Sequence, residues 1–352
     1  MKTLKFKHNL DKSLSQGHCI VVFLLVSVLV LMSQTACRSD KGNSSSVVLY
    51  CSVDQEIAEP IIAHFEKIHG IEVLVRFDTE ASKTVGLVQR LRAEASAPVC
   101  DVFWSSEVFY TIRLAREGLY QPYTSERTAQ WPSQYRDPNG LWYGFGLRGR
   151  SIAYNTQRIT LHQAPTSLED LLDTKWDKRL VMARPEFGTT GGDVASWFVH
   201  YGEQRAKAIL TGLKSNHMRL VSGNSTAVRQ VAMGQADICL TDTDDVYAAQ
   251  RNGWPVAMLP LNQAGAGALA IPNTAALIDK APHEQAARVL MGYLLSDGVE
   301  EQLLKSDSRN SPVNASCAGA SAYLLKDTLA IDYAHIADAL PSAIKRAREI
   351  LN

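Results

Sequence analysis

The stretch VVLYCSVDQEIAEPIIAHFEKIHGIEVLVRF, residues 47–77, decides the fold. It opens with an apolar run over 47–51, which predicts a strand. Apolar residues then recur every four positions, which predicts a helix over 55–67 with one buried face. Pro60 is expected only early in that helix, because proline has no amide hydrogen to donate. Residues 71–77 predict a second strand.

The same alternation continues with a helix over 83–94, a strand over 99–104 and a helix over 107–117. Strands that alternate with helices predict a parallel α/β sheet. Ligands of such sheets bind at the carboxyl ends of the strands. The residues that follow the three strands are therefore candidate ligand-binding residues: Ser52, Asp54, Thr79, Glu80, Ser105 and Glu107.

A second α/β unit is predicted to begin at Arg148, with strands over 152–154, 180–183, 218–221 and 236–240 and with helices that include one after Ser167. The segment 266–271 is expected to cross back, so that helices over 284–295 and 299–304 rejoin the first unit. The prediction is a two-lobed fold, with lobe 1 at 47–147 and 266–352 and lobe 2 at 148–265. Two crossings form a hinge that lets a cleft close on a ligand.

The N-terminus has the layout of a bacterial secretory signal. Lysines precede an apolar run over 20–32, and Ser33–Cys37 resembles the processing site of a lipoprotein, although Gln34 departs from the usual leucine. The prediction is a signal peptide over 1–36, lipidation of Cys37 and a polar tether over 37–46. The alternative is an uncleaved membrane anchor. The protein is thus expected outside the cytoplasm, held to the membrane by lipid.

Composition narrows the function classes. Residues 1–36 contain four lysines and one aspartate, so their removal changes the formal net charge from 0 to −3. The sequence has no run of basic residues, and nothing in it therefore indicates nucleic-acid binding. The remaining cysteines, Cys51, Cys100, Cys239 and Cys317, have no CxxC spacing, so at least two are expected as buried free thiols, although a disulfide stays possible. No hydrolase or nucleotide-binding motif nominates a nucleophile, so no enzyme activity is predicted.

A Gly/Thr loop over 187–193 precedes a predicted helix. Glycines allow close approach of the backbone, and helix N-termini carry unpaired amides that suit an anion. Gly188, Thr189 and Thr190 are therefore candidate anion-binding residues, joined by Asn224 and Ser225 from a similar loop. The alternative is an ordinary helix cap.

Arg148 and Arg150 lie at the first predicted crossing, on one face of a strand. A guanidinium binds a carboxylate or phosphate through two parallel hydrogen bonds. Arg148 is therefore a candidate ligand contact, and an ion pair that braces the hinge is the alternative.

The segment 240–245, Leu-Thr-Asp-Thr-Asp-Asp, is the densest acidic cluster. Acids gathered at one strand end repel one another, which favours a nearby cation. Asp244 and Asp245, with Asp54, are therefore candidate metal ligands. A solvated helix start is the alternative.

Four segments resemble the ferric-iron-binding periplasmic protein family: Val48–Ser52 with Asp54, Cys100–Trp104, Gly118-Leu119 and Gly234–Asp237. The resemblance covers nearly all of the chain after the signal. It implies the type-2 periplasmic-binding-protein fold and an ABC-importer permease as partner for a monomer. No resident cofactor is expected, apart from bound iron(III) or another hard cation with a synergistic anion.

The ligand set of the family is only partly retained. Adjacent tyrosines of the family correspond to Asp244 and Asp245, and a histidine corresponds to Asp54. Its acidic ligand corresponds to Ser106, with Glu107 one place later, and its anion loop to residues 188–191. Carboxylates suit hard cations broadly. The first hypothesis is therefore import of iron(III) or an iron–anion complex, and the alternative is a small organic anion or zwitterion, such as a phosphonate, sugar phosphate or carboxylate. An enzyme or signalling receptor on the same fold is a third possibility.

Overall fold

A computed structural model describes residues 46–78, 84–262, 265–313 and 327–352. The predicted signal peptide, Cys37, Thr79 and Glu80 lie outside these ranges. In the described part of the chain, no helix combines the length and the apolar character that a membrane span requires.

The sheet of the first lobe is mixed. Strand β1 (Ser46–Cys51) pairs in parallel with β2 (Glu72–Phe77) and β3 (Val102–Ser105), as predicted. Strand β10 (Ala270–Ile278) lies antiparallel beside β3, so the sheet is parallel over the three predicted strands and mixed where the returning strand joins it. The direction of β10 follows from its connection. The chain returns to the first lobe from the second through this strand, so β10 is not joined to β3 by the helical crossover that a parallel pair requires.

Helix α2 (Gln55–His69) buries Ile61, Ile62 and Phe65 and ends at Gly70 in a left-handed conformation. Pro60 lies in its second turn, so the expectation of an early position is not met. Pro60 is exposed, and the lost backbone hydrogen bond is offset by the apolar face on either side of it.

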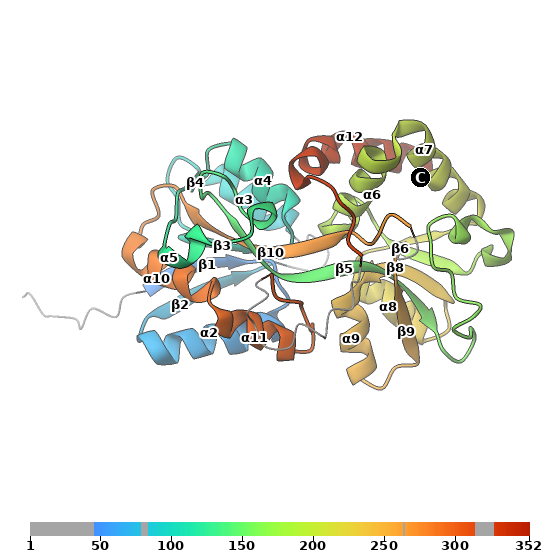
Figure 1. The fold of residues 1–352 in the computed structure, drawn as a ribbon, viewed down its shortest axis with the longest axis horizontal. Helices are drawn as coiled ribbons and strands as arrows, with labels where there is room; N and C mark the ends of the chain where they lie inside the picture. The colour runs from blue at the N-terminus through green and yellow to red at the C-terminus, as the bar shows by residue number, and fades with distance from the viewer. Residues whose placement is uncertain (1–45, 79–83, 263–264, 314–326) are drawn as a thin grey trace, which may run out of the picture. The chain divides into compact units, whose positions relative to one another are not determined.

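Strand β5 (Tyr143–Asn155) joins the two lobes (Figure 1). Its first half pairs antiparallel with β10, and its second half pairs antiparallel with β8 (Ile238–Asp242) and β9 (Val256–Pro260). All of its residues are buried. One continuous strand therefore supplies the first crossing, and the approach to β10 supplies the second.

The second lobe has parallel strands β6 (Leu180–Ala183), β7 (Arg219–Val221) and β8, with β6 in the centre. The α-helix predicted after Ser167 is wrong. Residues there form two 3₁₀ turns, Asp170–Leu172 and Thr174–Trp176. The break lies at Asp173, which has extended backbone and accepts a hydrogen bond from the amide of Lys175. An aspartate that caps a new turn ends the preceding one.

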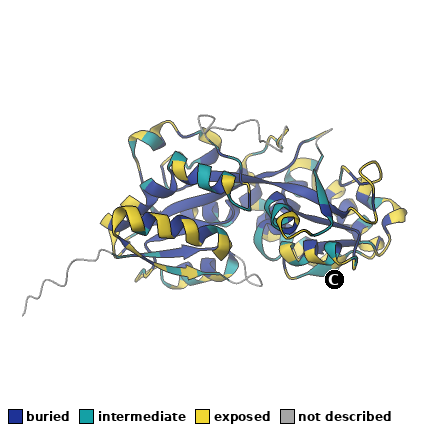
Figure 2. Ribbon diagram, turned by 90° about the horizontal axis from the view of Figure 1, so that it is seen from below, coloured by how far each residue is buried: buried dark blue, intermediate teal, exposed yellow. Residues whose placement is uncertain are grey.

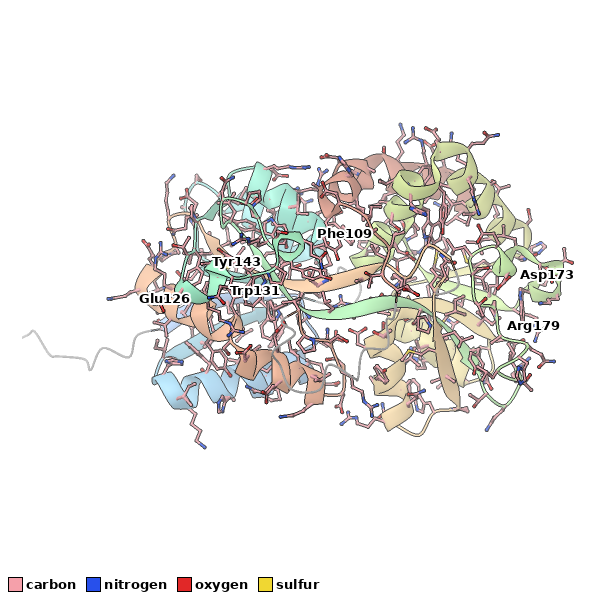
Figure 3. The ribbon with its side chains drawn as sticks, in the orientation of Figure 1. Phe109, Glu126, Trp131, Tyr143, Asp173 and Arg179 are labelled. Carbon is pink, nitrogen blue, oxygen red and sulfur yellow. The ribbon has the colours of Figure 1, made fainter. Side chains whose placement is uncertain are left out.

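Helix α12 (Tyr333–Leu351), which the sequence reading did not predict, departs from the expected division of lobes. Its first half, including Ile336 and Leu340, belongs to the first-lobe core, whereas Ala347 belongs to the second. Figure 3 places Phe109 of the first lobe beside α12, and its ring lies 6.3 Å from that of Tyr333. Residues 266–352 therefore do not all pack with lobe 1.

The central strands β1, β3, β5, β6, β8 and β10 are largely buried, whereas the edge strands β2 and β7 and the outer faces of the helices carry exposed residues (Figure 2). Cys51, Cys100 and Cys239 are buried free thiols, which confirms that prediction for the described cysteines. The elements not yet placed are α3 (Val85–Ala93), α4 (Phe109–Arg116), β4 (Tyr120–Gln121), α5 (Glu126–Ala129), a 3₁₀ turn at Ser133–Tyr135, α6 (Gly188–Tyr201), α7 (Glu203–Ser215), α8 (Asn224–Ala232), α9 (Thr243–Arg251), α10 (Glu284–Leu294) and α11 (Asp297–Lys305).

Candidate functional site

A cavity of about 50 Å³ lies where residues of both lobes meet around β5. Most of its lining residues are polar or charged, and they come from the ends of several strands and the starts of several helices, as expected for an α/β sheet. The lining residues are Val53, Asp54, Ile57, Ser106, Arg148, Ala183, Phe187, Gly188, Thr189, Thr190, Ser222, Gly223, Asn224, Asp242, Asp244, Asp245, Asn273, Leu303, Ser308 and Asn310.

Arg150 lies behind the cavity, completely buried within the second lobe. Its Nε donates to Asp193 at 2.9 Å, and its Nη1 donates to Asp242 at 2.7 Å. Burial raises the pKa of Asp193 in spite of the attraction of Arg150. Arg150 therefore has the structural role that was the alternative at the sequence level, bracing buried carboxylates at the crossing.

Arg148, two residues earlier on β5, lines the cavity. Its guanidinium donates to the Ser106 carbonyl and, through Nε at 3.3 Å, to Asp242. Burial by itself would lower the pKa of Arg148, but the surrounding carboxylates raise it above its ordinary value, and they belong to Asp244, Asp242, Asp245 and Asp54. Arg148 is therefore a buried cation within an acidic environment.

Asp242 is buried, and it accepts most of the hydrogen bonds that the predicted anion site offers. Besides both arginines, the Thr189 hydroxyl and the Asn224 amide donate to its Oδ2, the latter at 3.1 Å. Burial would raise the pKa of Asp242, but the attraction of Arg150 and Arg148 and the Thr189 hydrogen bond hold it below its ordinary value. Although Asp242 directly precedes α9, its side chain makes no capping bond to that helix.

The Gly/Thr segment differs from the predicted loop, because α6 begins at Gly188 and includes Thr189 to Asp193. Gly188, Thr189 and Thr190 nevertheless line the cavity. The Thr190 hydroxyl donates to Asn224 at 3.1 Å, which joins the N-terminal turns of α6 and α8. Helix N-termini thus form one wall, as the sequence predicted for an anion.

The acidic wall carries Asp54, which is exposed, and Asp244 and Asp245, which are half-buried in the first turn of α9. Carboxylate oxygens of Asp242, Asp244 and Asp245 lie within 4.8 Å of one another, close enough to surround one cation. The four bonds that Asp242 accepts leave Asp244 and Asp245 as the better candidates, together with Asp54. Oxygen donors of this kind suit hard cations.

Three predicted residues at the strand ends do not line the cavity: Ser52, Ser105 and Glu107. Ser52 and Ser106 are hydrogen-bonded across β1 and β3, so these ends do converge, but Ser106 alone lines the cavity. Glu107 is buried and accepts from the amides of Phe109 and Tyr110, which caps α4. Burial raises its pKa to about 7, against the effect of those amides and of Arg148.

Ser225 lies on an adjoining outer cavity of about 390 Å³, which shares Asp54, Asp244 and Asp245 with the inner one. Sequence reasoning missed Asn273, Ser308 and Asn310, which reach the inner cavity from β10 and from the segment after α11. No local motif marks them, since they come to the site through the return crossing.

Comparisons with known proteins agree with this arrangement. Residues 97–333 match the family model described as bacterial extracellular solute-binding protein. The chain is 26% identical over 326 residues to iron uptake protein A1 of Synechocystis sp., which covers 88% of this chain and 87% of the relative. It is 27% identical over 281 residues, 77% of this chain and 80% of the relative, to a periplasmic protein of Salmonella typhi whose name attributes 2-aminoethylphosphonate binding to it.

Among solved structures, iron-bound HitA from Pseudomonas aeruginosa matches with a TM-score of 0.78 and 25% identity, over 87% of this chain and 99% of that chain. This likeness confirms the predicted two-lobed periplasmic-binding-protein fold, and the family match covers most of the length of the protein. The chain therefore belongs to the bacterial extracellular solute-binding protein family.

Proposed function

We propose that this protein captures a small cationic solute outside the cytoplasm, with iron(III) as the first candidate, and delivers it to the permease of an ABC importer. The family is one of solute-binding proteins rather than of enzymes. The relative of Synechocystis named for iron uptake and the iron-bound HitA structure support iron as cargo. Export by the 1–36 signal and lipidation of Cys37 are part of the same proposal, since a tethered protein stays near its permease.

The observation that carries the cation proposal is the charge of the cavity wall. Carboxylates of Asp54, Asp244 and Asp245 line it, and Arg148 is the cation that faces them among the described residues. Asp242 pairs with Arg148 and Arg150, and Asp244 also lies 3.6 Å from Arg148, so the two guanidinium groups face four carboxylates, those of Asp54, Asp242, Asp244 and Asp245. The remaining negative charge favours a bound cation.

The position of Asp242 also bears on the anion of an iron–anion complex. Thr189, Asn224 and Arg148 are donors that would suit an incoming oxyanion, and all of them donate to the Asp242 carboxylate. Asp242 thus acts as a built-in anion. A synergistic anion would have to bind through the remaining donors, chiefly the amides at the N-terminus of α6.

A zwitterion such as an aminophosphonate is the second candidate. Two features favour it: the N-termini of α6 and α8 reach the same cavity as Asp244 and Asp245, and a Salmonella relative is named for 2-aminoethylphosphonate. The amides would hold the phosphonate and the carboxylates would hold the ammonium group.

The test is to load the purified protein with iron(III), with and without citrate or phosphate, and to measure metal retained after gel filtration together with the melting temperature. We expect one retained iron and a raised melting temperature, because a ligand that binds the folded state stabilises it. Among the described residues, none that lines the cavity is a tyrosine, so the complex should lack the visible absorption of an iron–phenolate bond. Stabilisation by 2-aminoethylphosphonate with no retained iron would favour the second candidate, and no response to either would contradict both.

A further inference from the structure

The β5–β10 pairing contains a bulge beside the cavity. Pro272 of β10 faces Leu147, but the next residue, Asn273, faces Phe145, so Gly146 has no partner across the ladder. Gly146 has a φ of 53°, and a Cβ there would lie 2.7 Å from the Leu303 side chain. Bulges of this kind re-aim neighbouring side chains.

The bulged residue holds two asparagines in a fixed orientation. The Gly146 carbonyl accepts from Nδ2 of Asn273 at 2.7 Å and from Nδ2 of Asn310 at 3.0 Å. A carbonyl accepts hydrogen bonds only from the nitrogen end of an amide. The oxygen of each asparagine is therefore the end turned away from Gly146.

Neither amide oxygen has a hydrogen-bond partner among the residues that the structure describes. Asn273 is 1% exposed and Asn310 is 3% exposed, and within the described residues neither Oδ1 accepts a hydrogen bond. A buried acceptor without a donor destabilises a protein, so each such group requires an explanation. Both residues line the cavity that also holds Arg148, Asp244 and Asp245.

We propose that the Oδ1 atoms of Asn273 and Asn310 are ligand contacts, which bind the cationic part of the solute from the first-lobe side of the cavity. The inference rests on the proposed function, which supplies the cation. Neutral amide oxygens would add ligand atoms for the cation without adding to the repulsion among the carboxylates. The amide oxygens can bind either a hard metal ion, as ligands, or the ammonium group of a zwitterion, as hydrogen-bond acceptors.

The experiment compares Asn273→Leu and Asn310→Leu with the conservative Asn273→Asp and Asn310→Asp, which keep an oxygen at the site. Asn155→Leu is the matched control, because Asn155 is also buried but its amide bonds with Val231 and Gln157 far from the cavity. Affinity is measured by calorimetry for iron(III) citrate and for 2-aminoethylphosphonate, and the melting temperature is measured without ligand.

We expect each leucine variant to bind at least tenfold more weakly while its ligand-free melting temperature falls less than that of Asn155→Leu. Each aspartate variant keeps an oxygen for the cation but loses the amide that donates to Gly146, so it should bind more tightly than the leucine variant at the same position. The probe whose affinity falls identifies the cation as metal or ammonium. Unchanged affinity in the leucine variants, with a wild type that binds, would overturn this inference alone, since the asparagines would then only brace Gly146. A wild type that binds neither probe would contradict the proposed function as well.

Discussion

Arg148 and Arg150 stand two residues apart on one strand, on the same face, and have different surroundings. Arg150 is completely buried and bonds Asp193 and Asp242 directly. Arg148 lines the cavity, donates to Ser106 and Asp242, and is influenced by carboxylates that face the solute. The comparison separates a charge network that holds the crossing together from one that faces the ligand.

The difference between the two arginines shows that the same residue type, two positions apart on one strand, has a structural role at Arg150 and lines the candidate site at Arg148. In the network around Arg150, the guanidinium is paired with Asp193 and Asp242, and its Nη2 atom has no hydrogen-bond partner among the described residues. Around Arg148, the carboxylates of Asp244 and Asp245 lie on the first turn of α9 and remain half-buried at the cavity. The excess of negative charge therefore lies near Arg148, at the cavity, where a bound cation can offset it.

The largest expected effect comes from removing the inner arginine. Arg150→Met leaves Asp193 and Asp242 buried with less compensation, which should lower the free energy of unfolding by about 3–5 kcal/mol. Arg148→Met should cost about 1–2 kcal/mol, because Asp242 keeps Arg150, Thr189 and Asn224. Urea unfolding of both variants at neutral pH measures the two losses. Equal losses would contradict the division of roles.

The second effect concerns pH and Glu107, which lies on the Arg148 side. Its pKa is about 7 in the folded protein against an ordinary value of 4.5, because burial disfavours its charged form. The folded state therefore holds a proton that the unfolded chain releases, so stability falls as pH rises from about 4.5 to 7, by up to about 3 kcal/mol. Glu107→Gln should remove this slope.

The Glu107 measurement is urea unfolding at several pH values between 4 and 8 for wild type and Glu107→Gln. A variant that keeps the wild-type pH dependence over that range would show that another group is responsible. Glu117→Gln is a suitable control, since Arg92 holds the pKa of Glu117 below its ordinary value through a surface hydrogen bond.

The smallest expected effect concerns the ligand-facing carboxylates. Asp244→Asn with Asp245→Asn should leave the ligand-free protein folded, because both side chains are half-buried and Arg148 keeps its ion pair with Asp242 when that with Asp244 is lost. It should abolish the stabilisation by ligand, which for wild type is about 2.7 kcal/mol at a ligand concentration of 100 Kd. Thermal melts with and without ligand test this. Glu59→Gln with Asp279→Asn, both outside the cavity, is the control for the loss of two negative charges. If ligand still stabilises the Asp244/Asp245 variant, these two residues serve only as the solvated start of α9.

Local patterns predicted much of the first lobe. Residues 46–116 form the predicted strands and helices in order, because apolar periodicity and strand-helix alternation are short-range signals. The reading failed after Ser167, where Asp173 divides the segment into 3₁₀ turns. It also missed α12, whose apolar residues pack on both cores.

The candidate site was predicted in part. Asp54, Arg148, Thr189, Asn224, Asp244 and Asp245 all line one cavity, although they come from distant parts of the sequence. Glu107 was placed there because it follows a strand, but its carboxylate turns back to cap α4. A strand end specifies the edge of a sheet and not the direction of each side chain.

The sequence by itself determined the two-lobed α/β class, the crossing at Arg148 and the gathering of acids after β8, since each depends on short-range periodicity or on residue type. Only the tertiary structure decided that Arg150 is bonded inside the lobe while Arg148 faces the cavity, and that Asp242 takes the donors of the predicted anion site. It also brought Asn273 and Asn310 to Gly146. The physical reason is that hydrogen-bond partners are chosen by position in space, and residues far apart in the chain meet only once both crossings are made.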